Sequence, residues 1–247
     1  MTKDSIIKLD GLTKKYGDFT AVDHLSLTVD QGEIFGLLGP NGAGKTTTIL
    51  MMLGLSEPTS GKVEVCGIDP TFNPLSVKEK VGYLPDEVGF YENLSGMDNL
   101  LYTAALNRIE ASAAGERAEH LLEQVGLTQK APEKVQTYSR GMKQRLGLAD
   151  ILIKEPEVII LDEPTSGIDP EGVRELLAMI KQLSRERGMT VLLSSYHLHQ
   201  IQQICDRVGI FVEGKLIAVG PIKELASSLF KSDPILLEAE AETVDEG

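Results

Sequence analysis

The sequence predicts an α/β fold with a parallel sheet core, antiparallel strands before it and a helical subdomain inserted into it. Short apolar runs at 34–38, 157–163 and 190–195 are typical of parallel strands buried on both faces. Apolar and polar residues alternate before residue 32, and the apolar spacing becomes helical between 97 and 126. A chain of 247 residues is long enough for one large α/β domain with such an insert.

The composition limits the classes of function. The formal net charge is −13, which argues against a nucleic-acid or anionic-lipid partner, because binding to either depends on basic surface. Cys66 and Cys205 lack metal-ligand spacing and are expected to be small apolar fillers in a reducing compartment. The chain shows no apolar signal core and no run of about 20 apolar residues that would span a membrane. We therefore expect a soluble cytosolic protein, and any membrane role must come through a partner.

The N-terminal segment, residues 5–32, is expected to form antiparallel strands. Leu25, Leu27 and Val29 alternate with polar neighbours, so one face of this segment is expected to be buried. Tyr16 stands beside two lysines and is expected to be exposed. It is either a tyrosine at a strand edge or a platform on which a flat base stacks.

A glycine-rich loop lies between the strand at 34–38 and a helical stretch from 44 to about 53. It fits the pattern G-x-x-x-x-G-K-[ST] in the strand–loop–helix context that this pattern requires. The glycines let several N–H groups point at one anion, and the helix N-terminus adds partial positive charge. Lys45 supplies a charge for the β and γ phosphates, and Thr46 supplies a hydroxyl for Mg²⁺. The predicted nucleoside triphosphate site comprises Gly39, Pro40, Asn41, Gly42, Ala43, Gly44, Lys45, Thr46 and Thr47.

The middle of the chain is expected to hold an all-helical insert. Short strands are predicted at 62–65 and 80–84, and Pro85 breaks the second of them and starts a loop. From about 95 to 137 the apolar residues recur at helical spacing and β-branched residues are few.

A second helix start follows this insert. Ser139 and Gly141 precede an apolar helix predicted at 146–153. The serine is either a simple N-cap or a contributor to a second anion site of the helix-terminus type.

Two carboxylates close the apolar run at 157–163. Ligands collect at the carboxyl ends of parallel strands, so Asp162 and Glu163 are expected to face the glycine-rich loop if the two strands are neighbours. Asp169 precedes a proline and opens a helix with one apolar face, so an N-cap role competes with any catalytic role for this residue.

The last predicted parallel strand, at 190–195, ends in Tyr-His-Leu-His. His197 and His199 do not suggest a metal site, since no third ligand has a fitting spacing. A hairpin at 210–219 and a last helix from 221 to about 230 complete the pattern.

Together these motifs resemble the ATP-binding subunit of an ABC transporter, a P-loop NTPase, over residues 6–229. The resemblance implies that Asp162 helps to hold Mg²⁺ and that Glu163 is the general base for the attacking water. It implies that Tyr16 stacks on adenine and that Asp169 belongs to the D-loop. It also implies a signature segment that closes over the γ-phosphate of ATP held by the other subunit, formed here by Ser139, Arg140, Gly141 and Met142.

Three motifs depart from the family pattern. The signature, commonly Leu-Ser-Gly-Gly-Gln, here reads Tyr-Ser-Arg-Gly-Met and resembles the branch that serves drug- and ion-extruding exporters. Asp86 replaces the Q-loop glutamine; it can still approach Mg²⁺ through water, but it adds a charge. Tyr196 takes the position of the switch histidine, with His197 one residue later. A phenol donates one hydrogen bond but is not cationic near neutral pH, so either Tyr196 substitutes, a local shift brings in His197, or turnover is slow.

By this resemblance the chain uses ATP and Mg²⁺, hydrolyses ATP and energises a separate integral-membrane permease for export. Two such subunits, as a homodimer or as paired ATPase subunits, would pack head to tail on the inner face of the cell membrane. The ATPase domain is expected to cover residues 1–230, with its helical insert at about 95–137. The acidic tail at 231–247 resembles the start of a C-terminal extension, and the hypothesis follows that the chain is truncated.

Two alternatives stay open at this point. One is a regulatory module that closes on ATP but hydrolyses it poorly, which Asp86 and Tyr196 favour. The other is a soluble ABC-type protein of DNA repair or translation. Three features count against this second alternative: each motif occurs once, long runs of heptad repeats are lacking, and the net charge is negative.

Overall fold

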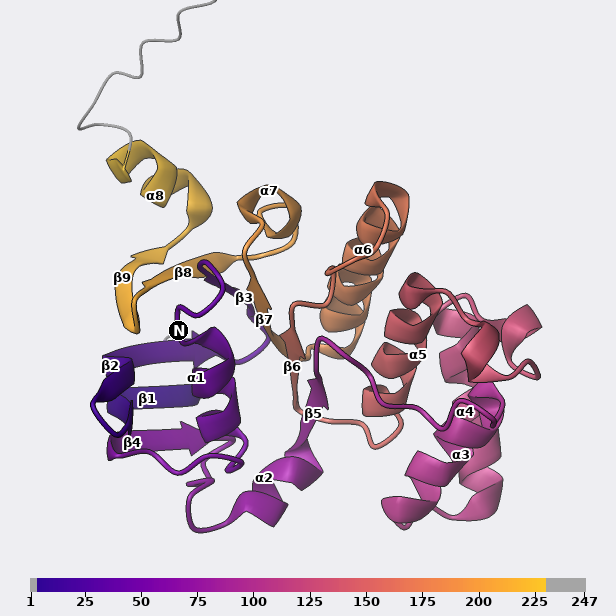
Figure 1. Ribbon diagram of the computed structural model, residues 1–247. Helices are drawn as coiled ribbons and strands as arrows, with labels where there is room; N and C mark the ends of the chain where they lie inside the picture. Colours follow the sequence, from indigo (N-terminus) through magenta and orange to yellow (C-terminus); the bar gives the residue numbers. More distant parts are fainter. Residues whose placement is uncertain (1–3, 230–247) are drawn as a thin grey trace, which may run out of the picture.

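The computed structural model describes residues 4–229, which form two sheets with helices packed around them (Figure 1). The smaller sheet is antiparallel with strand order β2-β1-β4, and the larger has the order β5-β6-β7-β3-β8-β9. Strands pair in parallel across the larger sheet until β8 and β9, which pair as an antiparallel hairpin. The strands are β1 Ser5–Tyr16, β2 Phe19–Asp30, β3 Ile34–Leu38, β4 Ser60–Val65, β5 Val81–Leu84, β6 Val158–Asp162, β7 Thr190–Ser195, β8 Arg207–Val212 and β9 Lys215–Gly220.

The helices divide into those beside the two sheets and a group at the far end of the molecule. Figure 1 shows α3 and α4 next to α5, on the side of the large sheet away from the antiparallel strands. The bounds are α1 Lys45–Met52, α2 Pro74–Lys80, α3 Gly96–Leu106, α4 Ala111–Gln124, α5 Arg140–Leu152, α6 Pro170–Arg187, α7 Leu198–Ile201 and α8 Ile222–Leu229, with 3₁₀ turns at Thr128–Lys130 and Val135–Thr137.

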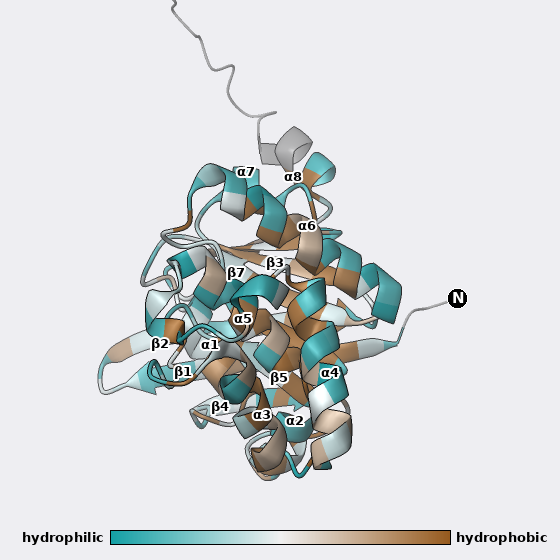
Figure 2. Ribbon diagram, turned by 90° about the vertical axis from the view of Figure 1, so that its right-hand side faces the viewer, coloured by the Kyte–Doolittle hydropathy of each residue, from teal (hydrophilic) through white to brown (hydrophobic). Residues whose placement is uncertain are grey.

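The hydrophobic core consists of two buried clusters that share strand β3. Along β3 the side chains alternate, with Ile34 and Leu38 in the cluster under α4, α5 and α6, and Phe35 and Leu37 in the cluster under α1 and the antiparallel sheet. This is the two-sided burial expected of a parallel strand. Helices such as α4 and α6 carry hydrophilic and hydrophobic residues on different sides, as the two colours in Figure 2 show. The loop that follows β3 is therefore held on a strand packed from both faces.

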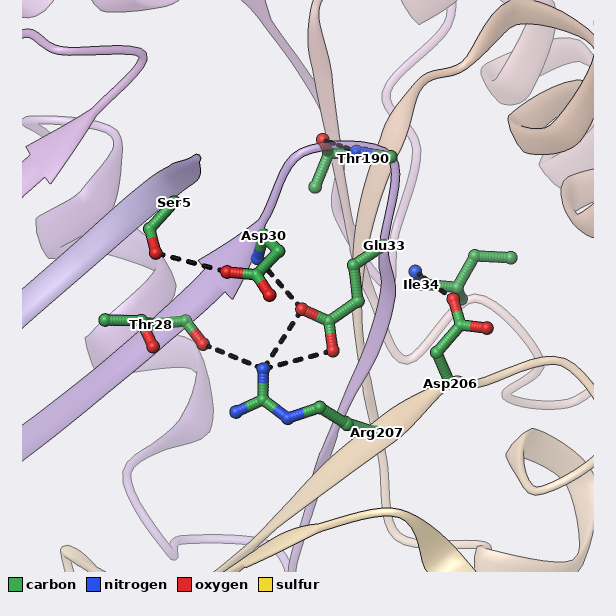
Figure 3. Close-up of polar contacts among 9 residues, drawn as sticks. Ser5, Thr28, Asp30, Glu33, Ile34, Thr190, Asp206 and Arg207 are labelled. Carbon is green, nitrogen blue, oxygen red and sulfur yellow. Dashed lines mark hydrogen bonds and ion pairs between the residues drawn. The ribbon is translucent and has the colours of Figure 1, made fainter. Parts of the chain in front are cut away.

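A buried ion pair fastens the antiparallel sheet to the start of β3. Glu33, 4% exposed, accepts a hydrogen bond from Asp30 N at 2.9 Å, and Arg207 Nη1 lies 3.2 Å from both of its carboxylate oxygens (Figure 3). The same guanidinium donates to Thr28 O at 3.4 Å. Burial raises the pKa of Glu33, while hydrogen bonding and the Arg207 charge oppose that shift. The cluster lies at the amino end of β3, opposite to the glycine-rich loop.

The predicted α/β fold class is confirmed, with local corrections. Helix α2 at Pro74–Lys80 is absent from the sequence prediction, because seven residues with one buried side chain, Val77, are too few for a periodic signal. Helix α5 begins at Arg140 rather than Leu146, since its first turn is polar. The strands β3 and β6 are not neighbours, because β7 lies between them.

The extent of the described residues bears on the expectations about membrane spans and about the C-terminal end. Within residues 4–229, no helix is both long enough and apolar enough to cross a membrane. The expected end of the last helix at about 230 and the acidic tail at 231–247 lie outside the described residues.

Candidate active site

The glycine-rich loop is pressed between neighbouring backbones where β3 ends and α1 begins. Gly44 has φ of 102°, and a Cβ placed there would lie 2.3 Å from the carbonyl oxygen of Ala21. A Cβ on Gly39 would lie 2.2 Å from the carbonyl oxygen of Phe211. Both contacts are far shorter than any real Cβ makes, so these positions require glycine. The loop shape that was predicted from spacing is therefore enforced by tertiary packing.

Lys45 is held inside the loop by three oxygens. Its side chain is 5% exposed, and Nζ donates to Gly39 O at 2.7 Å and to Pro40 O at 3.1 Å. Glu163 Oε1 lies 3.1 Å from the same nitrogen. A buried ammonium on the first helical turn, with exchangeable carbonyl partners, is suited to receive a phosphate.

Asp162 is the centre of a hydrogen-bonded group at the carboxyl end of β6. It is 4% exposed, and Thr46 Oγ1 donates to Oδ2 at 2.8 Å. Ser194 Oγ donates to Oδ1 at 2.5 Å and accepts from Glu163 N at 3.0 Å. These contacts bring the predicted Mg²⁺ ligands Thr46 and Asp162 together.

Ser194 was not identified from the sequence, and it explains how the site forms although β3 and β6 are separated. It lies on β7, the strand between them, with its side chain buried between Asp162 and the backbone of Glu163. The signal was present as two serines, Ser194 and Ser195, at the carboxyl end of the strand, where ligands collect. The prediction that the acids face the loop holds, although the neighbouring-strand condition attached to it is wrong.

Glu163 has a strained backbone and a partly unsatisfied carboxylate. Its φ is 49°, a conformation that non-glycine residues seldom adopt and that is often found at functional sites. Its side chain is 13% exposed, and within the described residues buried Oε1 has no hydrogen-bond partner, although Lys45 lies within ion-pair distance. Apart from that ion pair, Oε1 has capacity to accept a hydrogen bond or a proton from another donor.

These groups line a cavity of about 460 Å³ that also contains an aromatic wall. Tyr16 and Phe19, which pair across β1 and β2, are 51% and 64% exposed. Lys14 Nζ lies 5.0 Å from the Tyr16 ring centroid and supports its orientation. The volume is within the range of nucleotide-sized sites. Phe19 was overlooked in the sequence because it carries no motif of its own.

The donor set fits Mg²⁺ in company with phosphate. The Thr46 hydroxyl and the Asp162 carboxylate are adjacent oxygen donors, and Mg²⁺ characteristically takes one or two protein oxygens together with phosphate oxygens and water. Asp86 lines the same cavity, but its Oδ1 accepts a hydrogen bond from Arg140 Nη2 at 2.7 Å. Its predicted role near the metal stays a prediction.

The signature and D-loop residues have local structural roles in the single chain. Ser139 caps α5 and accepts from Met142 N at 3.2 Å, and Asp169 caps α6 and accepts from the N–H groups of Glu171 and Gly172. These bonds lower the pKa of Asp169. The N-cap interpretations are therefore confirmed. The residues that border the cavity in this chain do not include Ser139, Gly141, Met142 or Asp169.

Tyr196 and His197 also lie outside the lining of that cavity. Their rings are 3.8 Å apart, and Tyr196 borders a separate apolar cavity of about 590 Å³ with Gly39, Pro40 and Asn41. The His197 N–H donates to Ser195 Oγ at 3.0 Å. The assignments of Tyr196 and His197 to the γ-phosphate both stay predictions.

Comparison with known proteins identifies the family. Residues 22–166 match the family model described as ABC transporter. The chain belongs to the ABC transporter ATP-binding family. Bacitracin transport ATP-binding protein BcrA of Bacillus licheniformis is 45% identical over 221 residues, which are 90% of this chain and 71% of that protein. Linearmycin resistance ATP-binding protein LnrL of Bacillus subtilis (strain 168) is 40% identical over 91% of this chain and 72% of that protein.

Solved ABC structures share the architecture. The structure of cbiO1 from Clostridium perfringens, part of the ABC transporter complex cbiONQ, matches with a TM-score of 0.85 and 26% identity, covering 92% of each chain. This ABC subunit is accordingly an ATP-binding ATPase with the cassette fold, and the lysine, threonine and two acids described above line one cavity.

Proposed function

We propose that this ABC ATPase hydrolyses Mg²⁺-bound ATP to energise export through a separate membrane permease. One observation supports the catalytic assignment above all others: Lys45, Thr46, Asp162 and Glu163, from separate segments of the chain, converge on one cavity. Export is supported by relatives named for bacitracin transport and linearmycin resistance.

The residues divide the reaction between charge neutralisation and proton transfer. Lys45 exchanges its loop carbonyl partners for phosphate oxygens. Thr46 and Asp162 would hold Mg²⁺, which would neutralise charge on the phosphates. The unsatisfied Oε1 of Glu163 accepts a proton from the attacking water. Ser194 orients both acids by bonding to the Asp162 carboxylate and to the Glu163 N–H. Phosphoryl transfer to water needs no covalent intermediate with the protein. Positioning of the reactants and electrostatic stabilisation of the transition state therefore supply most of the rate enhancement.

A second copy completes the site in this proposal. Ser139 and Gly141 do not border the cavity of their own chain, yet they lie at a helix N-terminus, where N–H groups favour anions. In a head-to-tail homodimer, or in a pair with a different ATPase subunit, they would close on the phosphates held by the partner. ATP then stabilises the closed state, and hydrolysis releases it.

The variant Glu163→Gln tests hydrolysis and pairing together. We expect phosphate release to fall by about 100-fold or more, because a general base is lost. Mg²⁺-ATP should also trap this variant as a dimer in light scattering, whereas Mg²⁺-ADP leaves it monomeric. Glu171→Gln, at an exposed position in the first turn of α6, is the control and should behave as wild type. Equal phosphate release by wild type and Glu163→Gln would refute the catalytic assignment.

A regulatory module that binds ATP without turnover is the second candidate. It is favoured by the position of Tyr196 and His197 outside the nucleotide cavity. ATP-dependent dimerisation of the wild-type chain without measurable phosphate release would support it against the exporter ATPase.

A further inference from the structure

Two of the positions that depart from the family pattern touch each other. Arg140 Nη2 lies 2.7 Å from Asp86 Oδ1. Arg140 stands where the family signature commonly has glycine, and Asp86 stands where the Q-loop has glutamine. Two neutral residues are thus replaced by two residues of opposite charge in contact, and the net charge of the pair is unchanged.

Asp86 occupies an unfavourable place for an unpaired carboxylate. It lines the same cavity as Lys45, Thr46 and Asp162, where the triphosphate would be bound. Like charges that share a partly desolvated site repel each other more strongly than they do in water. Without a cation beside it, the extra carboxylate would weaken binding of a polyanion.

Helix α5 holds the segment around Asp86 at a second point. Gln144, 1% exposed and one helical turn after Arg140, donates from Nε2 to Asp86 O at 3.0 Å. Residues four apart lie on one face of a helix, so both contacts come from the same side of α5. The backbone of Asp86 is therefore held in place independently of its charge.

Arg140 also contacts the segment that follows the catalytic glutamate. Its Nη2 lies 3.4 Å from Ser166 Oγ, and a Cβ on Gly167 would lie 3.0 Å from Arg140 Cδ. The guanidinium thus bridges two loops that border the nucleotide site, one containing Asp86 and one following Glu163.

We infer that Arg140 is a positioning residue for the nucleotide site of its own subunit: it neutralises Asp86 and holds that carboxylate at the edge of the cavity. Asp86 can then replace the family glutamine without repelling the triphosphate. This inference rests on the proposed Mg²⁺-ATP site. It assigns Arg140 a role within one chain that is separate from any contact across a dimer.

The test is a double-mutant cycle on the full chain with Arg140→Ala, Asp86→Gln and the double variant. The dissociation constant for Mg²⁺-ATP is measured by calorimetry at a protein concentration where the chain is monomeric. We expect Arg140→Ala to weaken binding by about fivefold, the upper range for a partly exposed ion pair. The double variant should bind within about twofold of wild type, because the repelling carboxylate is gone.

Two further measurements separate charge from structure. The defect of Arg140→Ala should shrink as ionic strength rises, because salt screens the exposed Asp86 charge, and Arg140→Lys should restore most of the affinity. Lys143→Ala is the matched control. It breaks the 2.8 Å Lys143–Glu92 contact, which joins the same helix to the same loop, but neither residue lines the nucleotide cavity. The control should bind Mg²⁺-ATP as wild type does.

Additive effects in the cycle, or an Arg140→Ala defect that appears only when dimers form, would overturn the inference while leaving the proposed function intact. A wild-type chain that fails to bind Mg²⁺-ATP would overturn both.

Discussion

The two regions that the family assigns to one ATP site differ sharply in this chain. The region around the glycine-rich loop is assembled: buried Lys45 is ion-paired with Glu163, and buried Asp162 accepts hydrogen bonds from Thr46 and Ser194. The region around Ser139 and Asp169 is exposed, and its polar groups bond within their own helix starts. The first region is preorganised by tertiary packing, whereas the second is prepared only locally.

This difference supports the proposal that two subunits contribute different residues to each ATP site. A preorganised cavity can bind nucleotide in a single chain, because its charges are already paired and placed. Among the described residues, the cavity beside Arg140 at the start of α5 does not include Lys45, so we expect the signature residues to act only when a second surface meets them. Binding should therefore depend on the first region alone, and turnover on both.

The largest expected effect is the recovery of ATP hydrolysis when two inactive variants are mixed, and it tests whether the two regions act in different subunits. Lys45→Ala and Ser139→Ala should each lower ATP hydrolysis by about 100-fold, as loss of one transition-state contact does. Mixed in equal amounts, they should recover roughly a quarter of wild-type phosphate release, because half the head-to-tail dimers would carry one intact site.

No recovery on mixing would mean that each site is built within one chain. Ser139→Ala also removes the cap of α5, which costs about 1 kcal/mol of stability, so thermal unfolding is measured on the same samples. Each variant incubated alone at the doubled concentration is the control and should stay inactive.

A smaller effect is expected on the aromatic wall of the first region. Tyr16→Ala should raise the dissociation constant for ATP by about tenfold, the usual scale for loss of one base-stacking ring. Binding of inorganic tripolyphosphate, measured by the same calorimetry, should not change, because it has no base. Phe72→Ala removes a ring that is 80% exposed and should leave both affinities unaltered. Equal loss for ATP and tripolyphosphate would show that Tyr16 supports the loop rather than the base.

No change in ATP binding, but a change in folding stability, is expected from a substitution at Asp150, near the other end of α5. Burial raises the pKa of this carboxyl to about 6, although a Thr103 hydrogen bond and the Lys154 charge oppose the shift. Within the described residues its Oδ1 is buried without a hydrogen-bond partner. Because the folded pKa lies above the unfolded value, this group favours folding most below about pH 4, and its contribution is lost as pH rises to about 6.

Asp150→Asn should therefore stabilise the chain at pH 8 by about 1–3 kcal/mol relative to wild type, and by less at pH 5.5. Urea unfolding at the two pH values measures this, with exposed Glu119→Gln as the control. The affinity for Mg²⁺-ATP should stay unchanged, because Asp150 does not border the nucleotide cavity. A stability gain that is equal at both pH values would contradict the raised pKa.

The features of the fold that depend on local sequence patterns could be predicted from the sequence alone. Apolar runs identified the buried strands β3, β6 and β7, and the spacing of glycines with Lys45 identified the loop between β3 and α1. The acids at 162 and 163 followed from their place at a strand end. Each of these signals lies within about ten residues of chain, the range in which periodicity and turn chemistry act.

What the sequence did not reveal depends on contacts between distant segments. Ser194 acts only because β7 lies between β3 and β6, and strand order leaves no local trace. The contact between Asp86 and Arg140 joins residues 54 positions apart, so their two departures from the family pattern looked unrelated. Helix α2 was missed because its one buried side chain gives no period.

The central claim is that one chain, through its loop lysine, binds Mg²⁺-ATP in the assembled cavity. Calorimetric titration of Mg²⁺-ATP into wild type and Lys45→Ala tests it most directly, with Lys78→Ala, which lies outside that cavity, as the matched control. We predict saturable binding to wild type and Lys78→Ala, and a loss of at least about tenfold for Lys45→Ala, since a charged contact to phosphate is removed. Equal affinity of wild type and Lys45→Ala, or no binding by wild type, would contradict the account.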